Sequence, residues 1–201
     1  REVALKREEI TFLSADHPMV LSAIDSFLSK DHGNSAFFRL EKAGEQLLMV
    51  ETVSTLECIA PAHLHADRFL PAKPIRQIVD QKGGNRTDDF PIARIRSDGR
   101  PGPSTFLRDK SKALKGAVPP ILEVAANESE DIADEYRREA IETMEAQYDA
   151  EIERLRRLQE MGHPVRDTEI ELAEEEKKEL KKYLADTPLK VDSVRRILAM
   201  T

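Results

Sequence analysis

The side chains best suited to binding a partner are arginines and lysines, and most of them lie in one stretch of the sequence. Residues 82–119 hold nine Lys/Arg against four acids. Guanidinium and ammonium groups bind phosphates and carboxylates, so this excess indicates contact with nucleic acid or with an acidic partner. The alternative is a solvated connector with interspersed charge, which is the commoner role of a charged run.

A second candidate is the stretch RFLPAKPIR, residues 68–76, in which two prolines and two arginines surround an apolar pair. One interpretation is a rigid loop that presents Arg68 and Arg76 at a surface. The other is a stiff crossover between short strands, in which Phe69 and Leu70 fill the core and the arginines pair with nearby acids. The residues alone favour the second interpretation.

Together the two stretches supply the candidate partner-binding residues. These residues are Arg68, Arg76, Arg94, Arg96, Arg100, Arg108, Lys110, Lys112 and Lys115.

The sequence gives weaker support for a metal site or for catalytic residues than for a partner-binding surface. Cys58, His63, His65 and Asp67 form one cluster of possible ligands, with both histidines expected on the same side of an extended strand. A structural zinc site normally brings a second pair of ligands from elsewhere, so surface histidines are the better interpretation. The pair Gly83-Gly84 lacks the GxxxxGK[ST] pattern of a phosphate-binding loop, and HExxH, CxxC and nucleophile-elbow motifs are missing. We therefore expect no catalytic residue, no bound metal and no cofactor in this chain.

Composition sets the class of protein and its charge balance. The 201 residues are 40% hydrophobic and carry a net charge of −7, with 22 acids and 13 bases in residues 120–201. No apolar run approaches the roughly 20 residues needed to cross a bilayer. The opening REVALKREEI has no h-region or cleavage site, so we expect a cytoplasmic protein without a membrane partner.

Residues 1–96 are predicted to form a helix packed on a small sheet. A core helix begins at Pro18, capped by Asp16, and ends near Gly33. Alternating residues in NSAFFRLE and QLLMVETVSTLECIA predict an antiparallel hairpin, with Glu51 and Glu57 on its wet face. HLHADRFL and PIRQIVD are expected to be short strands, and DQKGGN a turn.

The second half of the chain is predicted to be mainly helical. Residues 97–119 form a basic connector with a short helix that stops or bends at Pro119-Pro120. Residues 120–187 form an acidic antiparallel hairpin, made of a helix of roughly 30 residues or more and a second helix over 168–185. Residues 188–201 fit either period: Val191, Val194 and Leu198 suit a helix, whereas Val191, Ser193, Arg195 and Ile197 suit a strand, and we favour a strand that returns to the sheet. The expected fold is therefore α+β, in one compact domain: a small, mostly antiparallel sheet with a packed helix, then a long-helix hairpin and a terminal strand.

Several segments, in register, resemble a known family. REVALKREEITFLSADHPMV, LHADRFLPAKPIRQIVD and HPVRDTEIE followed by a terminal strand are similar to the C-terminal region of the bacterial RNA polymerase-associated SWI/SNF-type ATPases, the RNA polymerase recycling factors. The resemblance spans nearly the whole chain. The matching residues, among them His17, Pro18, Arg68 and Arg76, belong to motifs without a catalytic role.

The resemblance implies a function that the residues alone do not indicate. Members of the family hydrolyse ATP, with Mg²⁺, in a helicase-like motor that lies N-terminal to the matching region, and they release RNA polymerase for reuse in transcription. This chain would then be a non-catalytic accessory domain in the bacterial cytoplasm, with core RNA polymerase, the parent ATPase lobes and DNA or RNA as partners. Two alternatives stay open: a purely structural module that restrains the ATPase lobes, and a dimerisation module formed through residues 128–185.

Overall fold

The computed structural model describes residues 17–28, 34–41 and 44–200. The chain divides into two compact units, residues 1–35 and 36–201, which are described separately. In the first unit, helix α1 (Pro18–Leu28) begins at Pro18 as expected. The Nδ1 atom of His17 accepts a hydrogen bond of 3.2 Å from the Met19 N–H, so this ring caps the first turn. The predicted cap Asp16 and the predicted end near Gly33 lie outside the described residues, and the packing of α1 on the sheet stays a prediction.

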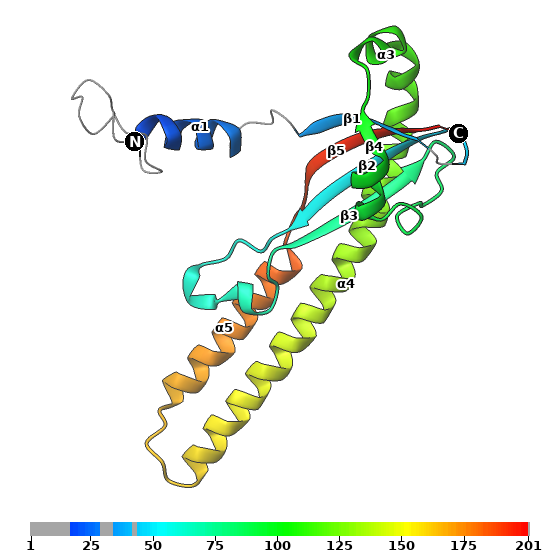
Figure 1. The fold of residues 1–201 in the computed structure, drawn as a ribbon. Coiled ribbons are helices and arrows are strands. Elements are labelled where there is room, and N and C mark those ends of the chain that lie inside the picture. The colour runs from blue at the N-terminus through cyan, green and yellow to red at the C-terminus, as the bar shows by residue number, and fades with distance from the viewer. Residues whose placement is uncertain (1–16, 29–33, 42–43, 201) are drawn as a thin grey trace, which may run out of the picture. The chain divides into compact units, whose positions relative to one another are not determined.

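The second unit is built on a five-stranded sheet in the order β3-β2-β5-β1-β4 (Figure 1). Its strands are β1 (Ser35–Leu40), β2 (Leu47–Leu56), β3 (Lys73–Asp80), β4 (Gly99–Pro101) and β5 (Leu189–Ala199). The pairs β2–β3, β2–β5 and β1–β4 are antiparallel. The predicted α+β class and the terminal strand that returns to the sheet are both confirmed.

The predicted hairpin of β1 with β2 is wrong, because β5 lies between them. Val50 of β2, for example, faces Val79 of β3 on one side and Arg196 of β5 on the other. An alternating pattern shows which face of a strand is apolar, but it does not identify the neighbouring strand.

The prediction that Glu51 faces water is also wrong, since its side chain is only 5% exposed. Arg76 of β3 and Arg195 of β5 lie at 2.6 Å and 3.0 Å from its two carboxylate oxygens. Two cations from the flanking strands therefore compensate a buried carboxylate in the central strand.

HLHADRFL is not a strand. It forms two 3-10 turns, Ala62–Leu64 and Ala66–Arg68, which are joined by His65 in the left-handed region at φ 47°. Leu64 and Leu70 are buried in one cluster with Leu180 and Leu184 of the second hairpin helix, so the turns fold this segment onto the helices. The predicted strand in PIRQIVD and the turn in DQKGGN are confirmed as β3 and as a turn with Gly83 at φ 81°.

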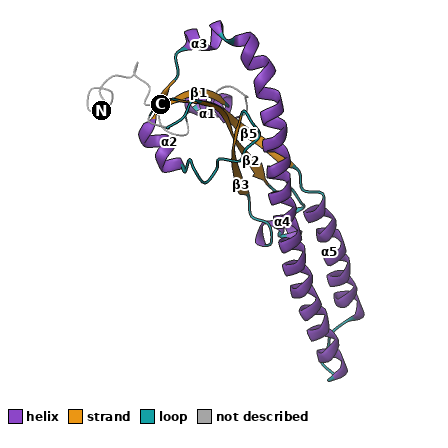
Figure 2. Cartoon of the chain, turned by 90° about the vertical axis from the view of Figure 1, so that its right-hand side faces the viewer, coloured by secondary structure: helices purple, strands orange, loops and turns teal. Residues whose placement is uncertain are grey.

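Helix α4 (Ser111–Glu160) runs for 50 residues through Pro119 and Pro120, where a stop or bend was predicted. The helix does not stop, and Figure 2 shows its N-terminal part curving over the sheet. Each internal proline costs roughly 3 kcal/mol. Directly after the prolines, Ile121 and Ala125 are buried against β2 and β3, and this packing offsets part of that cost.

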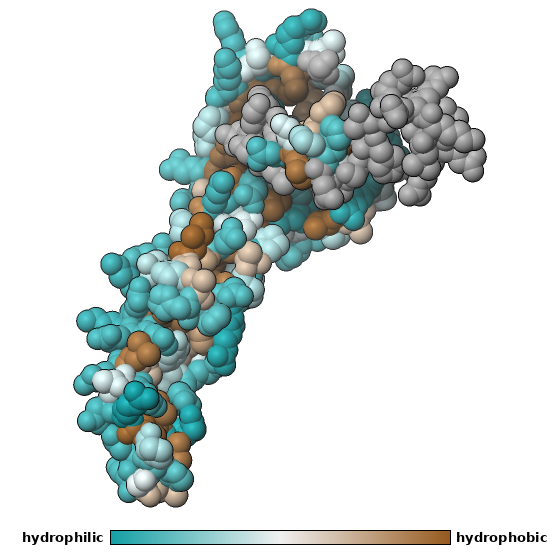
Figure 3. Space-filling model, turned by 90° about the vertical axis from the view of Figure 1, so that its left-hand side faces the viewer, coloured by the Kyte–Doolittle hydropathy of each residue, from teal (hydrophilic) through white to brown (hydrophobic). Residues whose placement is uncertain are grey.

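Helix α5 (Asp167–Ala185) lies antiparallel to α4, which confirms the predicted helical hairpin (Figure 1). Leu180 and Leu184 of α5 are fully buried with Met144 of α4. Outside this seam, Lys177 and Lys181 each lie 2.7 Å from an acid of α4. The face of the hairpin in Figure 3 is mainly hydrophilic with scattered hydrophobic side chains. No helix in the described part of the chain is long and apolar enough to cross a membrane.

Candidate partner-binding surface

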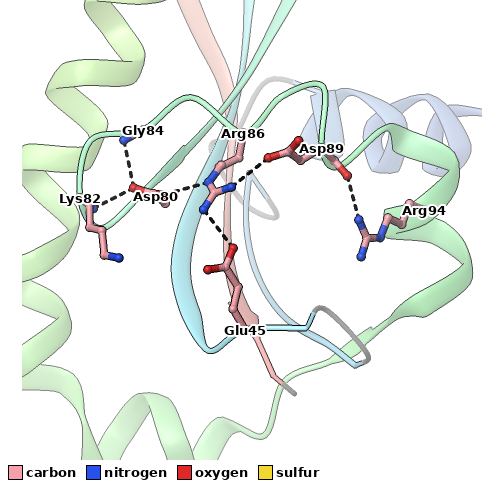
Figure 4. Close-up of polar contacts among 7 residues, drawn as sticks. All are labelled: Glu45, Asp80, Lys82, Gly84, Arg86, Asp89 and Arg94. Carbon is pink, nitrogen blue, oxygen red and sulfur yellow. Dashed lines mark hydrogen bonds and ion pairs between the residues drawn. The ribbon is translucent and has the colours of Figure 1, made fainter.

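The loop that follows β3 opens the basic stretch of residues 82–119, and the side chain of Arg86 holds this loop in place (Figure 4). Its Nε donates to Asp80 Oδ2 at 3.0 Å, and its two terminal nitrogens lie 3.0 Å from Asp89 and 2.9 Å from Glu45. Hydrogen bonds to Asp80 and Asp89 raise the pKa of Arg86 above its ordinary value. This guanidinium therefore ties together the end of β3, the loop and the turn before β2.

Asp80 fixes the turn itself. Its Oδ1 accepts the backbone N–H groups of Lys82 at 2.8 Å and Gly84 at 2.9 Å. Burial alone would raise the pKa of Asp80, but these two hydrogen bonds and the one from Arg86 lower it overall. The carboxylate is therefore a charged structural element of the loop.

Arg94 is the first of the predicted binding residues in helix α2 (Ile92–Asp98). Its guanidinium donates to the Asp89 carbonyl at 2.9 Å (Figure 4). It also lies 4.7 Å from the centre of the Phe90 ring. Phe90 and Ile95 are both buried in the same core cluster. Arg94 thus anchors the start of α2 as well as adding positive charge.

The next predicted residues follow along β4, α3 (Ser104–Asp109) and the first turns of α4. Arg100 donates to the carbonyls of Ser97 and Gly99, and Arg108 lies 3.5 Å from Asp109. Within residues 94–115, four exposed cations have no side-chain hydrogen bond or ion pair with any described residue: Arg96, Lys110, Lys112 and Lys115. We call residues 94–115 the cationic segment.

Close packing holds the middle of the cationic segment against β1. The rings of Phe37 and Phe106 stack with their centres 5.4 Å apart. A Cβ atom at Gly102 would lie 2.0 Å from the Phe37 ring, so only glycine fits there. The segment is therefore a folded surface, although its local charge pattern is that of a connector.

The structure separates the two arginines of RFLPAKPIR. Arg76 Nε donates to Glu51 at 2.6 Å, and its Nη2 donates to the Phe90 carbonyl at 2.6 Å. Arg76 therefore braces the sheet, in line with the structural interpretation. Arg68 is exposed, and its guanidinium lies 5.5 Å from the centre of the Phe69 ring.

Arg68 borders an open hollow of about 530 Å³ between the 3-10 turns and α4. Phe69 and Tyr148 pack there as a tilted pair with ring centres 6.4 Å apart. Burial and the nearby Glu176, which accepts the Tyr148 hydroxyl at 3.4 Å, raise the pKa of Tyr148. On the helix surface, Arg154 donates two hydrogen bonds, of 2.8 Å and 2.6 Å, to Glu151 and lowers the pKa of that carboxyl group.

Sequence reasoning missed this hollow. Its two sides lie about 80 residues apart in the chain, and Glu151 with Arg154 has the spacing of an ordinary surface pair on a helix. The one available signal was Arg68, which lies next to an aromatic residue in a proline-framed stretch.

The possible metal cluster is not assembled in the part of the chain that the structure describes. No group of three or more His, Cys, Asp or Glu side chains is placed there to hold a metal ion. His65 lies at the junction of the two 3-10 turns, and His63 is 4.0 Å from Glu179 of α5.

These features define an α+β module with a helical hairpin, a cationic segment and no phosphate-binding loop in its sequence. The chain belongs to the family described as "RNA polymerase recycling family C-terminal", which matches residues 1–199.

The chain is similar to the C-terminal family region of several curated relatives. It is 29% identical over 204 residues to the "RNA polymerase-associated protein RapA" of Sodalis glossinidius, and 30% identical over 204 residues to the protein of that name from Proteus mirabilis. Each match covers 98% of this chain and 21% of the relative. The chain thus spans about a fifth of the length of these relatives.

Proposed function

We propose that this chain is a non-catalytic accessory domain that helps an RNA polymerase recycling factor to dock on RNA polymerase. The observation that carries the proposal is the family match over residues 1–199. The name of these relatives, RNA polymerase-associated protein, supports the polymerase as the partner. In this proposal the domain acts where bacterial RNA polymerase acts, in the cytoplasm.

The absence of nucleotide-binding motifs from the sequence supports a non-catalytic role. The turn at Gly83 and Gly84 packs on the Asp80 carboxylate, which approaches to 3.1 Å of the Cβ position of Gly84. A phosphate-binding loop needs open backbone N–H groups, but here the N–H of Gly84 is already donated to that carboxylate. ATP and Mg²⁺ chemistry would belong to the motor of the longer parent protein.

The cationic segment supports a second contact, with the phosphate backbone of DNA or RNA. Arg96, Lys110, Lys112 and Lys115 are exposed and make no ion pair with other described residues. Contacts of this kind do not read sequence, and they weaken steeply with salt because bound counterions are released. The acidic hairpin would repel the same phosphates, so the segment alone would make this contact.

The proposal is tested by measuring the affinity of the 201-residue chain for core RNA polymerase, and separately for short RNA and DNA, at low and at physiological salt. We expect polymerase binding at both salt concentrations, and weaker, sequence-independent nucleic-acid binding that falls with salt. ATP hydrolysis measured in the same samples should stay at background. If the chain binds none of these at low salt, the docking role is wrong and the structural alternative, a module that restrains the ATPase lobes, remains.

A further inference from the structure

The hollow beside Arg68 continues along α4 towards the end of the hairpin. A second hollow of about 160 Å³ shares Ala150 and Arg154 with the first and extends it to Leu158 and Met161. Residues 147, 150, 154, 158 and 161 repeat at steps of three and four, so they share one face of the helix. We call the two hollows together the α4 groove.

The α4 groove combines an aromatic and apolar floor with cationic edges. The Phe69 and Tyr148 rings lie at its upper end, and Met161, which is 69% exposed, lies at its lower end. Arg68, Arg154 and Arg157 stand along its edges. Aromatic residues, Met and Arg are the types enriched in the centres of protein interfaces.

Two of these arginines keep donors available to a partner. The Arg68 guanidinium has no carboxylate partner among the described residues, although the hairpin around it is rich in acids. Arg154 donates Nε and one terminal nitrogen to Glu151, and the guanidinium carries five N–H donors in all. A carboxylate can therefore be bound without breaking an existing pair.

The charge around the α4 groove favours a peptide over a nucleic acid. Glu151 and Glu153 also line it, so its three arginines leave an excess of one positive charge. Residues 120–201, which include both helices of the hairpin, carry 22 acids against 13 bases. A chain of phosphates would pass many of these acids within a Debye length of about 8 Å. A segment with one or two carboxylates beside an apolar side chain meets the arginines and avoids most of that repulsion.

We propose that the α4 groove binds an acidic protein segment whose apolar or aromatic side chain enters the hollow between Phe69, Tyr148 and Ala150. Arg68 and Arg154 bind the flanking carboxylates. The inference rests on the proposed function, because it takes RNA polymerase as the protein that supplies this segment. It assigns polymerase contact to the hairpin and leaves nucleic acid to the cationic segment.

The test measures the affinity of the full 201-residue chain for nucleic-acid-free core RNA polymerase, with Arg68→Ala and Arg154→Ala as groove variants. Arg138→Ala is the matched control, because Arg138 pairs with Glu135 three residues before it on α4, as Arg154 pairs with Glu151, but lies outside the groove. Arg108→Ala is the control for the cationic segment. All four side chains are exposed, so circular dichroism and thermal melting should show unchanged folding.

Each groove variant should weaken polymerase binding about thirtyfold or more, which is the scale of an interface hot spot, and both controls should change it less than about twofold. If wild type binds and the groove variants bind equally well, the inference is wrong and the proposed function stands. If wild type does not bind core RNA polymerase, both the inference and the proposed function are wrong. Equal weakening by Arg108→Ala, or loss of RNA binding in Arg68→Ala, would also overturn the inference, because it would place the contact elsewhere or make the ligand a nucleic acid.

Discussion

Asp80→Asn tests whether one buried carboxylate holds the loop that leads into the cationic segment. The substitution keeps the size of the side chain, and the amide oxygen can still accept the N–H groups of Lys82 and Gly84. It removes the charge, however, and turns an N–H group towards Arg86 Nε, which now lies 3.0 Å from Asp80 Oδ2. Two donors then face each other at a position where the side chain is only 4% exposed.

The expected cost follows from that single lost contact. A hydrogen bond to a charged group contributes about 1.5–3 kcal/mol, so we expect a loss of about 2 kcal/mol in the free energy of unfolding at pH 7. For a domain of this size, such a loss lowers Tm by roughly 4–8 °C. Urea and thermal denaturation followed by circular dichroism measure both quantities. Asp89→Asn is the control: Asp89 binds the same guanidinium but its side chain is 54% exposed, so the expected loss is below about 1 kcal/mol.

The stability difference between wild type and Asp80→Asn should also depend on pH, in a direction that follows from the pKa of Asp80. The pKa of Asp80 in the folded protein lies below its ordinary value of 3.8, so its contribution to stability is present above that pH. The contribution is lost as the pH falls through the lowered pKa and the carboxylate becomes protonated. The difference between wild type and Asp80→Asn should therefore shrink as the pH is lowered below 3.8. An equal difference at neutral and acid pH, or an Asp80→Asn variant no less stable than Asp89→Asn, would refute the reasoning.

Four further substitutions test the packing by urea denaturation. Arg76→Met leaves the buried Glu51 with only one of its two cations, and we expect a loss of about 3 kcal/mol; a loss below about 1 kcal/mol would contradict the bracing role. Gly102→Ala forces a methyl group into the aromatic ring beside it and should cost about 1–3 kcal/mol, whereas Gly116→Ala, in an open part of α4, should stabilise by up to about 1 kcal/mol. Leu184→Ala empties a fully buried position between α4 and α5 and should cost about 2–5 kcal/mol; a neutral effect would mean that the hairpin seam is not a core.

Local patterns predicted α5 and the long apolar run of α4, because the apolar period lies close together in the sequence, but they did not predict helix α2 or the passage of α4 through the two prolines. The hairpin of α4 with α5 was predictable for this reason, whereas the period of the terminal segment fitted a helix and a strand equally. The position of β5 between β1 and β2 could not be predicted from local patterns. Strand pairing depends on contacts between residues about 140 positions apart, such as Val50 and Arg196. The burial of Glu51 was missed for the same reason, since both of its cations come from other strands.

The two binding surfaces also differ in how far the sequence predicts them. The cationic segment is continuous in the sequence, so its charge could be found by counting residues. The folded geometry of the cationic segment could not be predicted from the sequence, because this geometry depends on the stacking of Phe106 on Phe37. The α4 groove has no local signature, since Arg68 meets Tyr148 and Arg154 only after the 3-10 turns have folded onto the helix. The helical assignment of Pro119 and Pro120 likewise follows from tertiary packing that overrides a local propensity.

The central claim is that the two surfaces bind different partners, and a crossed measurement tests it most directly. Affinities for core RNA polymerase and for a short single-stranded RNA are measured for a groove variant, Arg68→Ala with Arg154→Ala, and for a cationic-segment variant, Lys110→Ala with Lys112→Ala and Lys115→Ala. We predict that the groove variant loses polymerase affinity and keeps RNA affinity. The cationic-segment variant should lose RNA affinity, with a shallower salt dependence, and keep its polymerase affinity. If both variants weaken the same ligand to the same extent, or neither weakens any, the account is contradicted.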